Sequence, residues 1–437
     1  MRIRLTGTGI VAAGIALAAV VVAATPGNSS GSRHTMARGA ERPTDISSAP
    51  KNAPKKSEKA DKSNKKTSAK QPELTRPEFT VADQAAAQIP GLPGVRFWAD
   101  SIADFEHALP TQQGPWLILS TGGEEGAYGA GFLNGWSQSG KRPEFAAITG
   151  VSTGALMATY VFAGQKYDEE LHQRYTSISA SDIFEVASTP ESLTDTWPLA
   201  DLIKKGVTPE ILAAIAAEHQ KGRRLFVVTT NLDAGKSVVW NMGAIAVHGG
   251  EPALNLYRQI LLASAAVPGV FPPVYITAEA NGRQFQEMHG DGGINGPLFF
   301  APVPYLVPGS PKKLPGNAYY VIVNGKLSGE FYLPQRNTAA ILGRSITLAL
   351  KAGGRLQLVL ASMAAKQAGV PFNLTYVEDS FAPIGQGLFD PAYMKALYEN
   401  GVAQGRSDHR FHSGLPMTSA PESPTARDGS MAGPMAK

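Results

Sequence analysis

The sequence predicts an α/β protein with a mainly parallel central sheet. Four segments dominated by apolar residues, at 116–119, 145–148, 225–230 and 319–323, have the length of strands. Their apolar residues follow one another without regular alternation, which is typical of strands buried on both faces of a parallel sheet. Segments with helical spacing lie between these strands, and this alternation is the pattern of a layered α/β domain.

The expected elements follow in chain order. The first are a helix over 81–89, a strand over 94–99 and the strand over 116–119. Next come a glycine-rich stretch over 121–131, a helix that runs to about 136, the strand over 145–148, a turn over 150–154 and a helix from 155. Residues 165–222 combine helical patterns with polar residues, and we expect them to cover the sheet.

The second half continues the alternation. We expect the strand over 225–230, a stretch over 237–240 that pairs with its continuation, a helix over 254–266 and a strand over 284–288 that leads into Asp291. After these come the strand over 319–323, a long helical region over 338–368 interrupted at Gly353-Gly354, a strand over 372–377 and a last helix over 391–403.

The N-terminal segment 1–24 has the pattern of a secretory signal. Arg2 and Arg4 precede an apolar run over 10–24, and the small residues Val22 and Ala24 stand where an export peptidase cleaves. An uncleaved membrane anchor is the alternative, but this run of 15 residues falls short of the ~20 that cross a bilayer. We therefore expect export across the cytoplasmic membrane, to a periplasmic, envelope-associated or secreted location.

The segment 25–78 is expected to be a disordered basic linker. It is rich in Ser, Lys, Ala, Pro and Asn and has few large apolar residues that could offset the entropy of ordering. Its lysines suit either a solvated spacer, which we favour, or contact with an anionic membrane or envelope surface. Residues 413–437 are expected to be a second disordered tail, so that the folded domain spans 79–412.

The charge distribution gives little support to nucleic-acid binding by the folded region. Residues 1–70 contain thirteen Lys or Arg and four Asp or Glu, whereas the whole chain carries only +4. The body is therefore mildly acidic, which is the opposite of a nucleic-acid-binding surface. The chain has no cysteine, so disulfides, thiolate metal sites and a lipid-modified N-terminal cysteine are excluded.

Ser152 is the candidate nucleophile. It lies in Gly150-Val151-Ser152-Thr153-Gly154, between an expected strand and an expected helix. A serine on such a turn has an exposed hydroxyl, the flanking glycines Gly150 and Gly154 permit the tight backbone, and the helix N-terminus favours a developing negative oxygen.

The Gly-x-Ser-x-Gly pattern alone is weak, since a chain of this composition contains roughly a third of a match by chance. Gly27-Asn28-Ser29-Ser30-Gly31 also matches, but no strand precedes it and no helix follows it. The strand–turn–helix context is what distinguishes Ser152.

A serine hydroxyl needs a base, and the histidines are poor candidates. The usual chain order is Ser, then Asp or Glu, then His. Asp408-His409 fits this order but lies near the C-terminal end, and His289 precedes Asp291. Asp291 itself follows an expected strand and is followed by Gly292 and Gly293, which leave its carboxylate open to close approach, although Asp-Gly also forms ordinary turns.

The glycine-rich stretch after the first strand is the third candidate. Gly122, Gly123 and Gly126 do not fit the spacing of a dinucleotide loop, and the Lys-Ser/Thr of a nucleotide loop is missing. An oxyanion hole is the better use, with the backbone N–H groups of Gly122 and Gly123 directed at a tetrahedral oxygen.

Taken together, these segments resemble the patatin-like phospholipase family. The resemblance is carried by four segments in this order: the glycine-rich turn, Gly150-Val151-Ser152-Thr153-Gly154, the run Ala263-Ser264-Ala265-Ala266-Val267-Pro268-Gly269-Val270-Phe271-Pro272-Pro273, and Asp291-Gly292-Gly293. It implies a three-layer α/β/α fold and a Ser–Asp dyad in which Asp291 accepts the proton of Ser152 directly. It also implies that Thr153 joins Gly122 and Gly123 in the oxyanion hole, and that neither a metal nor a cofactor is needed.

The resemblance implies that the substrate is a lipid or another ester, with release of an acyl chain. Glu124 and Glu125, in the middle of the glycine-rich turn, would disfavour an anionic head group unless they point away. Two alternatives to a serine acyl hydrolase share this fold: a catalytically poor protein that binds the envelope or membrane, and an acyltransferase that uses the same acyl-enzyme.

Overall fold

A computed structural model describes residues 76–186, 191–331, 333–336, 338–382, 388–412 and 415. From Pro77 onward these residues belong to one compact unit. The predicted secretory signal, nearly all of the predicted linker and nearly all of the predicted C-terminal tail lie outside the described residues and stay predictions. Among the described helices, none combines the length and the apolar character needed to cross a bilayer.

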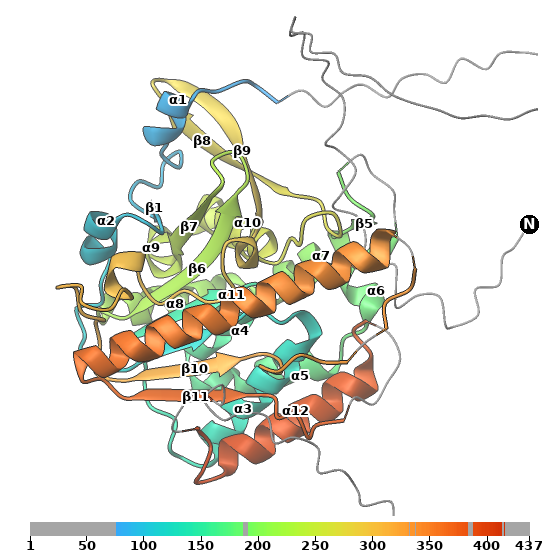
Figure 1. Ribbon diagram of the computed structural model, residues 1–437. Coiled ribbons are helices and arrows are strands. Elements are labelled where there is room, and N and C mark those ends of the chain that lie inside the picture. Colours follow the sequence, from blue (N-terminus) through green and yellow to red (C-terminus); the bar gives the residue numbers. More distant parts are fainter. Residues whose placement is uncertain are drawn as a thin grey trace, which may run out of the picture. The chain divides into compact units, whose positions relative to one another are not determined.

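A nine-stranded sheet forms the centre of the fold, in the order β1-β7-β6-β3-β2-β10-β11, with β8 and β9 attached beside β6 (Figure 1). The strands are β1 (Arg96–Trp98), β2 (Trp116–Leu119), β3 (Ala147–Val151), β6 (Arg224–Asn231), β7 (Lys236–Asn241), β8 (Val274–Ala280), β9 (Arg283–Asp291), β10 (Tyr319–Val323) and β11 (Phe372–Tyr376). The five strands β6, β3, β2, β10 and β11 are mutually parallel, which confirms the predicted mainly parallel sheet.

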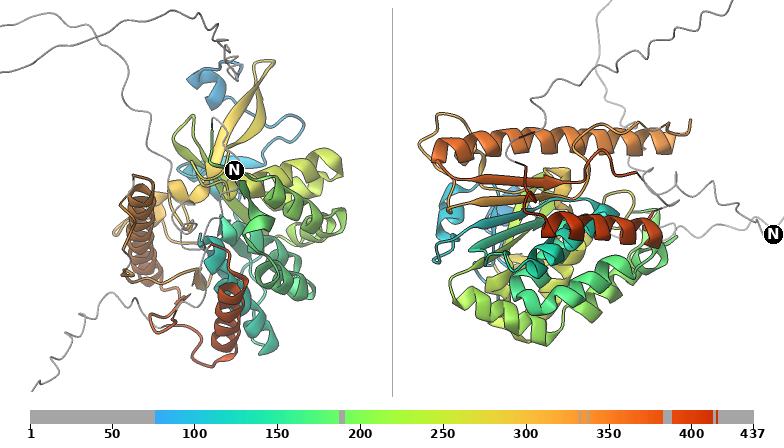
Figure 2. Two further views of the ribbon diagram at one scale, coloured as in Figure 1. Left: turned by 90° about the vertical axis from the view of Figure 1, so that its right-hand side faces the viewer. Right: turned by 90° about the horizontal axis from the view of Figure 1, so that it is seen from below.

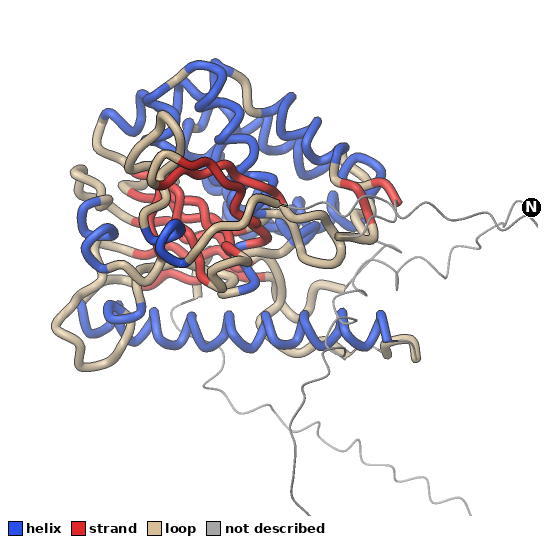
Figure 3. Tube along the Cα trace, turned by 90° about the horizontal axis from the view of Figure 1, so that it is seen from above, coloured by secondary structure: helices blue, strands red, loops and turns tan. Residues whose placement is uncertain are grey.

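Helices cover both faces of this sheet, as predicted (Figures 2 and 3). The α-helices are α1 (Val81–Ala85), α2 (Ile102–His107), α3 (Gly126–Gln138), α4 (Thr153–Ala163), α5 (Asp168–Thr176), α6 (Ala180–Ile183), α7 (Trp197–Gly206), α8 (Pro209–Gln220), α9 (Met242–His248), α10 (Gly250–Ser264), α11 (Thr338–Ala368) and α12 (Pro391–Arg406). The shorter elements are the hairpin of β4 (Glu185–Val186) with β5 (Thr194–Asp195) and the 3₁₀ turns η1 (Gly123–Glu125), η2 (Gln165–Tyr167), η3 (Gly292–Ile294) and η4 (Val303–Tyr305).

The strand β2 shows why its sequence is apolar at every position. Leu117 and Leu119 pack into the core on one face of the sheet, together with residues of α3 and α4. Trp116 and Ile118 pack into the core on the other face, which α11 and α2 cover. Successive side chains of a strand point to opposite faces, so a strand covered on both sides needs apolar residues throughout.

Several elements differ from the expectation. The strand β8 and the helices α2 and α9 are not among the predicted elements. The helix over 338–368 is continuous, whereas an interruption was predicted at Gly353-Gly354. A Cβ on Gly354 would lie 2.9 Å from the ring of Pro297. Gly354 therefore lets α11 pack closely against Pro297, and it does not end the helix.

Candidate active site

Ser152 lies on a strained turn between β3 and α4. The strand runs through Gly150 to Val151, three residues further than predicted, so that a single residue separates it from the helix. Ser152 has φ 56° and ψ −124°, a backbone conformation that side chains avoid and that persists mainly at functional sites. A Cβ on Gly150 would lie 2.4 Å from the carbonyl oxygen of Gly154, so glycine at 150 is what lets the helix return this close to its strand.

The pairing of β6 brings Asp291 to this turn. β3 runs parallel to β6 and ends with Val151 opposite Val228. β9 approaches the same edge of β6 from the other direction and ends with Asp291 opposite Thr229. Because Val228 and Thr229 are consecutive, the two strand ends meet, and residues 152 and 291 become neighbours across 139 positions of sequence.

The Asp291 carboxylate accepts the Gly293 N–H over 2.7 Å and faces the Ser152 hydroxyl. Burial raises the pKa of Asp291 to about 6, and the Ser152 hydroxyl and the Gly293 N–H oppose this rise. A carboxylate with this pKa is a stronger base than an ordinary aspartate, yet it is still ionised at neutral pH.

The glycines beside Asp291 allow this close packing. A Cβ on Gly292 would lie 2.4 Å from the carbonyl oxygen of Val228, and one on Gly293 would lie 2.7 Å from the side chain of Thr121. Asp291-Gly292-Gly293 is thus a turn, as its composition suggests, and a turn whose carboxylate meets Ser152.

The segment 264–266 ties the two strand ends to one another. Ser264 is fully buried; its hydroxyl accepts the Ser152 N–H over 3.0 Å and donates to the Val228 carbonyl over 2.7 Å. Two residues on, the Ala266 carbonyl accepts the Asp291 N–H over 2.8 Å. The sequence pointed to this run through the family resemblance, but its role as a brace for both candidate residues is visible only in the structure.

We expect Ser264→Ala to weaken both stability and turnover. The Ser152 N–H and the Val228 carbonyl would lose a buried partner, which costs about 1–3 kcal/mol of unfolding free energy. A displaced turn should lower kcat for ester hydrolysis by about ten- to a hundredfold, with less effect on KM. Denaturant unfolding and steady-state kinetics measure the two effects.

Ser139→Ala is the matched control for this variant, because the Ser139 hydroxyl also donates to a backbone carbonyl, that of Trp136, at 2.7 Å. Equal kcat values for the two variants would show that Ser264 does not position the Ser152 turn.

The glycine-rich turn presents free backbone donors near Ser152. Among the described residues, the N–H groups of Gly122, Gly123 and Thr153 have no hydrogen-bond partner. Gly123 has φ 56°, and the space that its side chain would occupy is open. Three unpaired N–H groups around a buried turn are suited to an oxyanion.

Side chains behind the glycine-rich turn hold it in place. The Asn324 side chain, just after β10, donates to the Ser120 carbonyl over 2.9 Å, and the Ser120 hydroxyl accepts the Asn324 N–H over 2.8 Å. A Cβ on Gly122 would lie 2.5 Å from Asn324, and one on Gly126 would lie 2.2 Å from the Thr153 hydroxyl. The glycines therefore also set the contact between this turn, β10 and α4.

Glu124 and Glu125 make contacts with other parts of the chain. The Glu124 carboxylate accepts the backbone N–H of Phe389, and burial raises its pKa. Glu125 lies beside Gly325, and burial raises its pKa to about 7, while the nearby Lys351 opposes the rise. Both carboxyl groups thus belong to the packing of the turn against 325 and 389.

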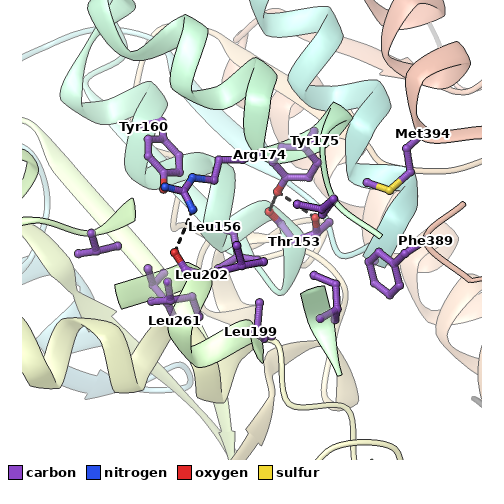
Figure 4. A pocket seen from close by; sticks show the side chains of 15 residues that line it. Thr153, Leu156, Tyr160, Arg174, Tyr175, Leu199, Leu202, Leu261, Phe389 and Met394 are labelled. Atoms are coloured by element: carbon purple, nitrogen blue, oxygen red, sulfur yellow. Dashed lines mark hydrogen bonds between the residues drawn. The ribbon is translucent and has the colours of Figure 1, made fainter. Parts of the chain in front are cut away.

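A mainly apolar cavity adjoins Gly123 and Thr153 (Figure 4). Its walls come from α4, α5, α7, α10 and the segment around α12. Its apolar lining is formed by Leu156, Tyr160, Tyr175, Ile178, Ile183, Leu199, Leu202, Ile203, Val207, Leu261, Phe389 and Met394. Tyr175 joins the cavity to the turn, because its hydroxyl donates to the Thr153 carbonyl over 2.8 Å.

His289 is engaged elsewhere. It is fully buried, its Nδ1 lies 2.9 Å from the Thr229 hydroxyl, and its Nε2 lies 3.3 Å from the Glu287 carboxylate. Arg96 forms an ion pair with Glu287 on the far side. This histidine thus belongs to a buried polar network within the sheet.

Residues 117–304 match the family described as patatin-like phospholipase. The matched region contains most of β2, the glycine-rich turn, the Ser152 turn, the 264–266 brace and Asp291. Among solved structures, the chain is similar to VipD from Legionella pneumophila, with 11% identity and a TM-score of 0.35, over 71% of this chain and 69% of that one. A similarity of this degree carries no argument about the site, and no curated protein matches the sequence. The region that matches the patatin-like phospholipase family, 117–304, thus contains every catalytic and oxyanion residue predicted from the sequence.

Proposed function

We propose that the protein is a serine acyl hydrolase in which Ser152 and Asp291 form the catalytic dyad. The family suggests a lipid acyl hydrolase. The observation that carries the assignment of residues is the meeting of two strand ends on β6, which brings Ser152, on a strained turn beside free N–H donors, to the buried Asp291 carboxylate.

In the acylation step, the Ser152 Oγ attacks the ester carbonyl carbon and its proton passes to Asp291. The carbonyl oxygen becomes an oxyanion that accepts hydrogen bonds from the N–H groups of Gly122, Gly123 and Thr153, each worth on the order of 3 kcal/mol in related chemistry. The carbon–oxygen bond of the ester then breaks, and Asp291 returns the proton to the leaving alcohol.

In the deacylation step, Asp291 takes a proton from water, whose oxygen attacks the acyl-enzyme. Collapse of the second tetrahedral intermediate breaks the bond to Ser152 Oγ, which takes the proton back from Asp291, and the carboxylic acid leaves. The raised pKa of Asp291 suits both directions of transfer, because the group gains and loses a proton near neutral pH.

The cavity next to Gly123 and Thr153 is suited to the acyl chain of the substrate. It adjoins the donors that would hold the carbonyl oxygen, and its walls are mainly aliphatic and aromatic. Burying an acyl chain there contributes about 0.8 kcal/mol per methylene group. We therefore infer a preference for esters with an extended acyl chain.

The experiment is to incubate the full chain with a panel of phospholipids and neutral acyl esters and to identify the products by mass spectrometry. We expect a free fatty acid from at least one lipid with wild-type protein and none with Ser152→Ala. Products that persist in the Ser152→Ala protein would contradict the assignment.

A further inference from the structure

The helix α11 has two apolar faces, and only one of them packs against the body. The inner face buries Leu358, Ala361, Ala364 and Ala365 in the core. The four large apolar side chains of the outer face are 53, 45, 59 and 49% exposed, in the order Ile341, Leu348, Leu356 and Met363. Their spacings of seven, eight and seven residues are close to two helical turns, so they form one stripe, which we call the outer stripe.

No charge interrupts the outer stripe. From 341 to 363, all the described exposed positions of α11 are uncharged: Ile341, Ser345, Leu348, Ala349, Ala352, Gly353, Leu356 and Met363. The water-facing side of a surface helix normally carries charged and polar residues. This face therefore differs from an ordinary solvated one over about six turns.

A row of cations lies along one flank of the outer stripe. Arg344, Lys351 and Arg355 share this flank, being seven and four residues apart, and α11 contains no Asp or Glu. They hold the preceding segment: Arg344 donates to the Glu330 carbonyl, Lys351 pairs with the Glu330 carboxylate at 2.9 Å, and Arg355 donates to the Leu327 carbonyl. An apolar face beside a basic flank is the pattern of helices that lie in the interface of anionic membranes.

The N-terminal half of α11 extends past the edge of the sheet at which Ser152 lies. The helix links the parallel strands β10 and β11 and so runs opposite to them. Gln357 contacts Gly296 and Leu298, just after the Asp291 turn. The residues of α11 before Gly353 therefore extend beyond the end of the sheet at which Asp291 lies. Figure 1 shows α11 passing the ends of both strands. Phe331 and Leu333, 91 and 76% exposed, precede the helix on this side.

We propose that the outer stripe of α11 docks the protein onto an anionic lipid surface, with the helix lying in the plane of the interface. The choice of a lipid as the source of that surface rests on the proposed function. The apolar stripe would enter the boundary between head groups and acyl chains. The flank, on which Glu330 neutralises Lys351 but not Arg344 and Arg355, keeps a net positive charge that would lie at the level of the lipid phosphates. Docking would place the edge of the sheet that carries Ser152 near its substrate.

Charge favours a lipid surface over a second copy of the chain. Two copies joined through the outer stripe would bring together two helices that each contain four cations and no acid, of which Glu330 neutralises only Lys351. Like charges in such contact are unfavourable, whereas anionic head groups complement them.

Vesicle binding by the full chain tests this proposal. We would use Ser152→Ala protein, so that binding is measured without turnover and its failure stays separate from a failure of the proposed activity. With vesicles of phosphatidylglycerol and phosphatidylcholine, Leu348→Glu/Leu356→Glu should weaken sedimentation at least about tenfold, because two apolar contacts are lost and two anions are added.

The matched control is Val81→Glu/Val247→Glu, which makes the same charge change at exposed valines on α1 and α9, 85 and 45% exposed. Equal loss of binding in the two double variants would overturn the proposal. It would show that binding depends only on the net charge of the protein, to which the basic N-terminal segment contributes, and not on the outer stripe.

A second measurement locates the contact even if a double variant fails to fold. Because the chain has no cysteine, Leu356→Cys and Val247→Cys each allow single-site labelling with an environment-sensitive dye. Anionic vesicles should shift the emission of the dye at 356 to shorter wavelength and leave the dye at 247 unchanged. A shift at 356 that follows protein concentration without vesicles would instead indicate self-association and overturn the proposal, as would no shift at all.

Discussion

Replacing Asp291 with Asn should remove ester hydrolysis while making the protein more stable at neutral pH. The loss of turnover is expected to be about 10³-fold or more, because the amide cannot accept the proton of Ser152. The amide oxygen can still accept the Gly293 N–H, and the amide nitrogen can donate to the Ser152 oxygen, so the fold has no reason to change. Steady-state kinetics with a soluble ester measures the first effect.

The gain in stability follows from the raised pKa of Asp291. The folded protein holds the carboxyl proton with a pKa of about 6 instead of the ordinary 3.8, so the folded state binds more protons than the unfolded state between these values. Stability from this group is therefore fully present at low pH and is lost as pH rises through about 6. At 1.36 kcal/mol per pKa unit, ionising Asp291 costs roughly 3 kcal/mol at pH 7.

Asp291→Asn avoids this cost, and denaturant unfolding at several pH values measures the difference. We expect the variant to exceed wild type by up to about 3 kcal/mol at pH 7 and to match it near pH 4. A variant that is less stable than wild type at pH 7 would show that the carboxylate is a stabilising group, contrary to its burial.

Replacing Ser152 should separate catalysis from backbone strain. Both Ser152→Ala and Ser152→Gly remove the nucleophile, and we expect hydrolysis to fall by about 10⁴-fold or more in each. The two variants should differ in stability, because alanine keeps the unfavourable φ of 56°, whereas glycine adopts it without strain. We expect Ser152→Gly to be about 1 kcal/mol more stable than Ser152→Ala.

Denaturant midpoints of the two Ser152 variants provide this comparison, with wild type as the reference. Equal midpoints, or a less stable glycine variant, would mean that the turn stores no strain.

Local patterns predicted much of the fold. The strand limits at 116–119 and 319–323 agree with β2 and β10 residue by residue, because an unbroken apolar run in a covered sheet has few alternative structures. β8 is missing from the prediction because, in Val274–Ala280, buried residues alternate with Thr277 and Glu279, so the segment lacks the unbroken apolar run that marks β2 and β10. The expected break at Gly353-Gly354 was wrong, because the need for glycine at 354 comes from Pro297, which is distant in sequence.

The candidate site was predicted in part, because local motifs can be found in the sequence whereas contacts between distant segments cannot. Ser152, Asp291 and the glycines around them stand in short motifs, so the sequence named them, and the structure places them together. The Ser264 brace depends on which carbonyl lies near its hydroxyl, here that of Val228, and no spacing rule gives that. The cavity draws its lining from several helices whose packing is set by long-range contacts. Leu298, Phe299 and Phe300, which follow the aspartate, are instead buried in the core.

The central claim is that the hydroxyl at position 152 is the activated nucleophile. Incubation with a fluorophosphonate, followed by peptide mass mapping, tests it directly. We predict one phosphonyl adduct, on the peptide that contains Ser152, with slower formation in Asp291→Asn protein and no adduct in Ser152→Ala protein. An adduct on another residue, or unchanged labelling in the Ser152→Ala protein, would contradict the account.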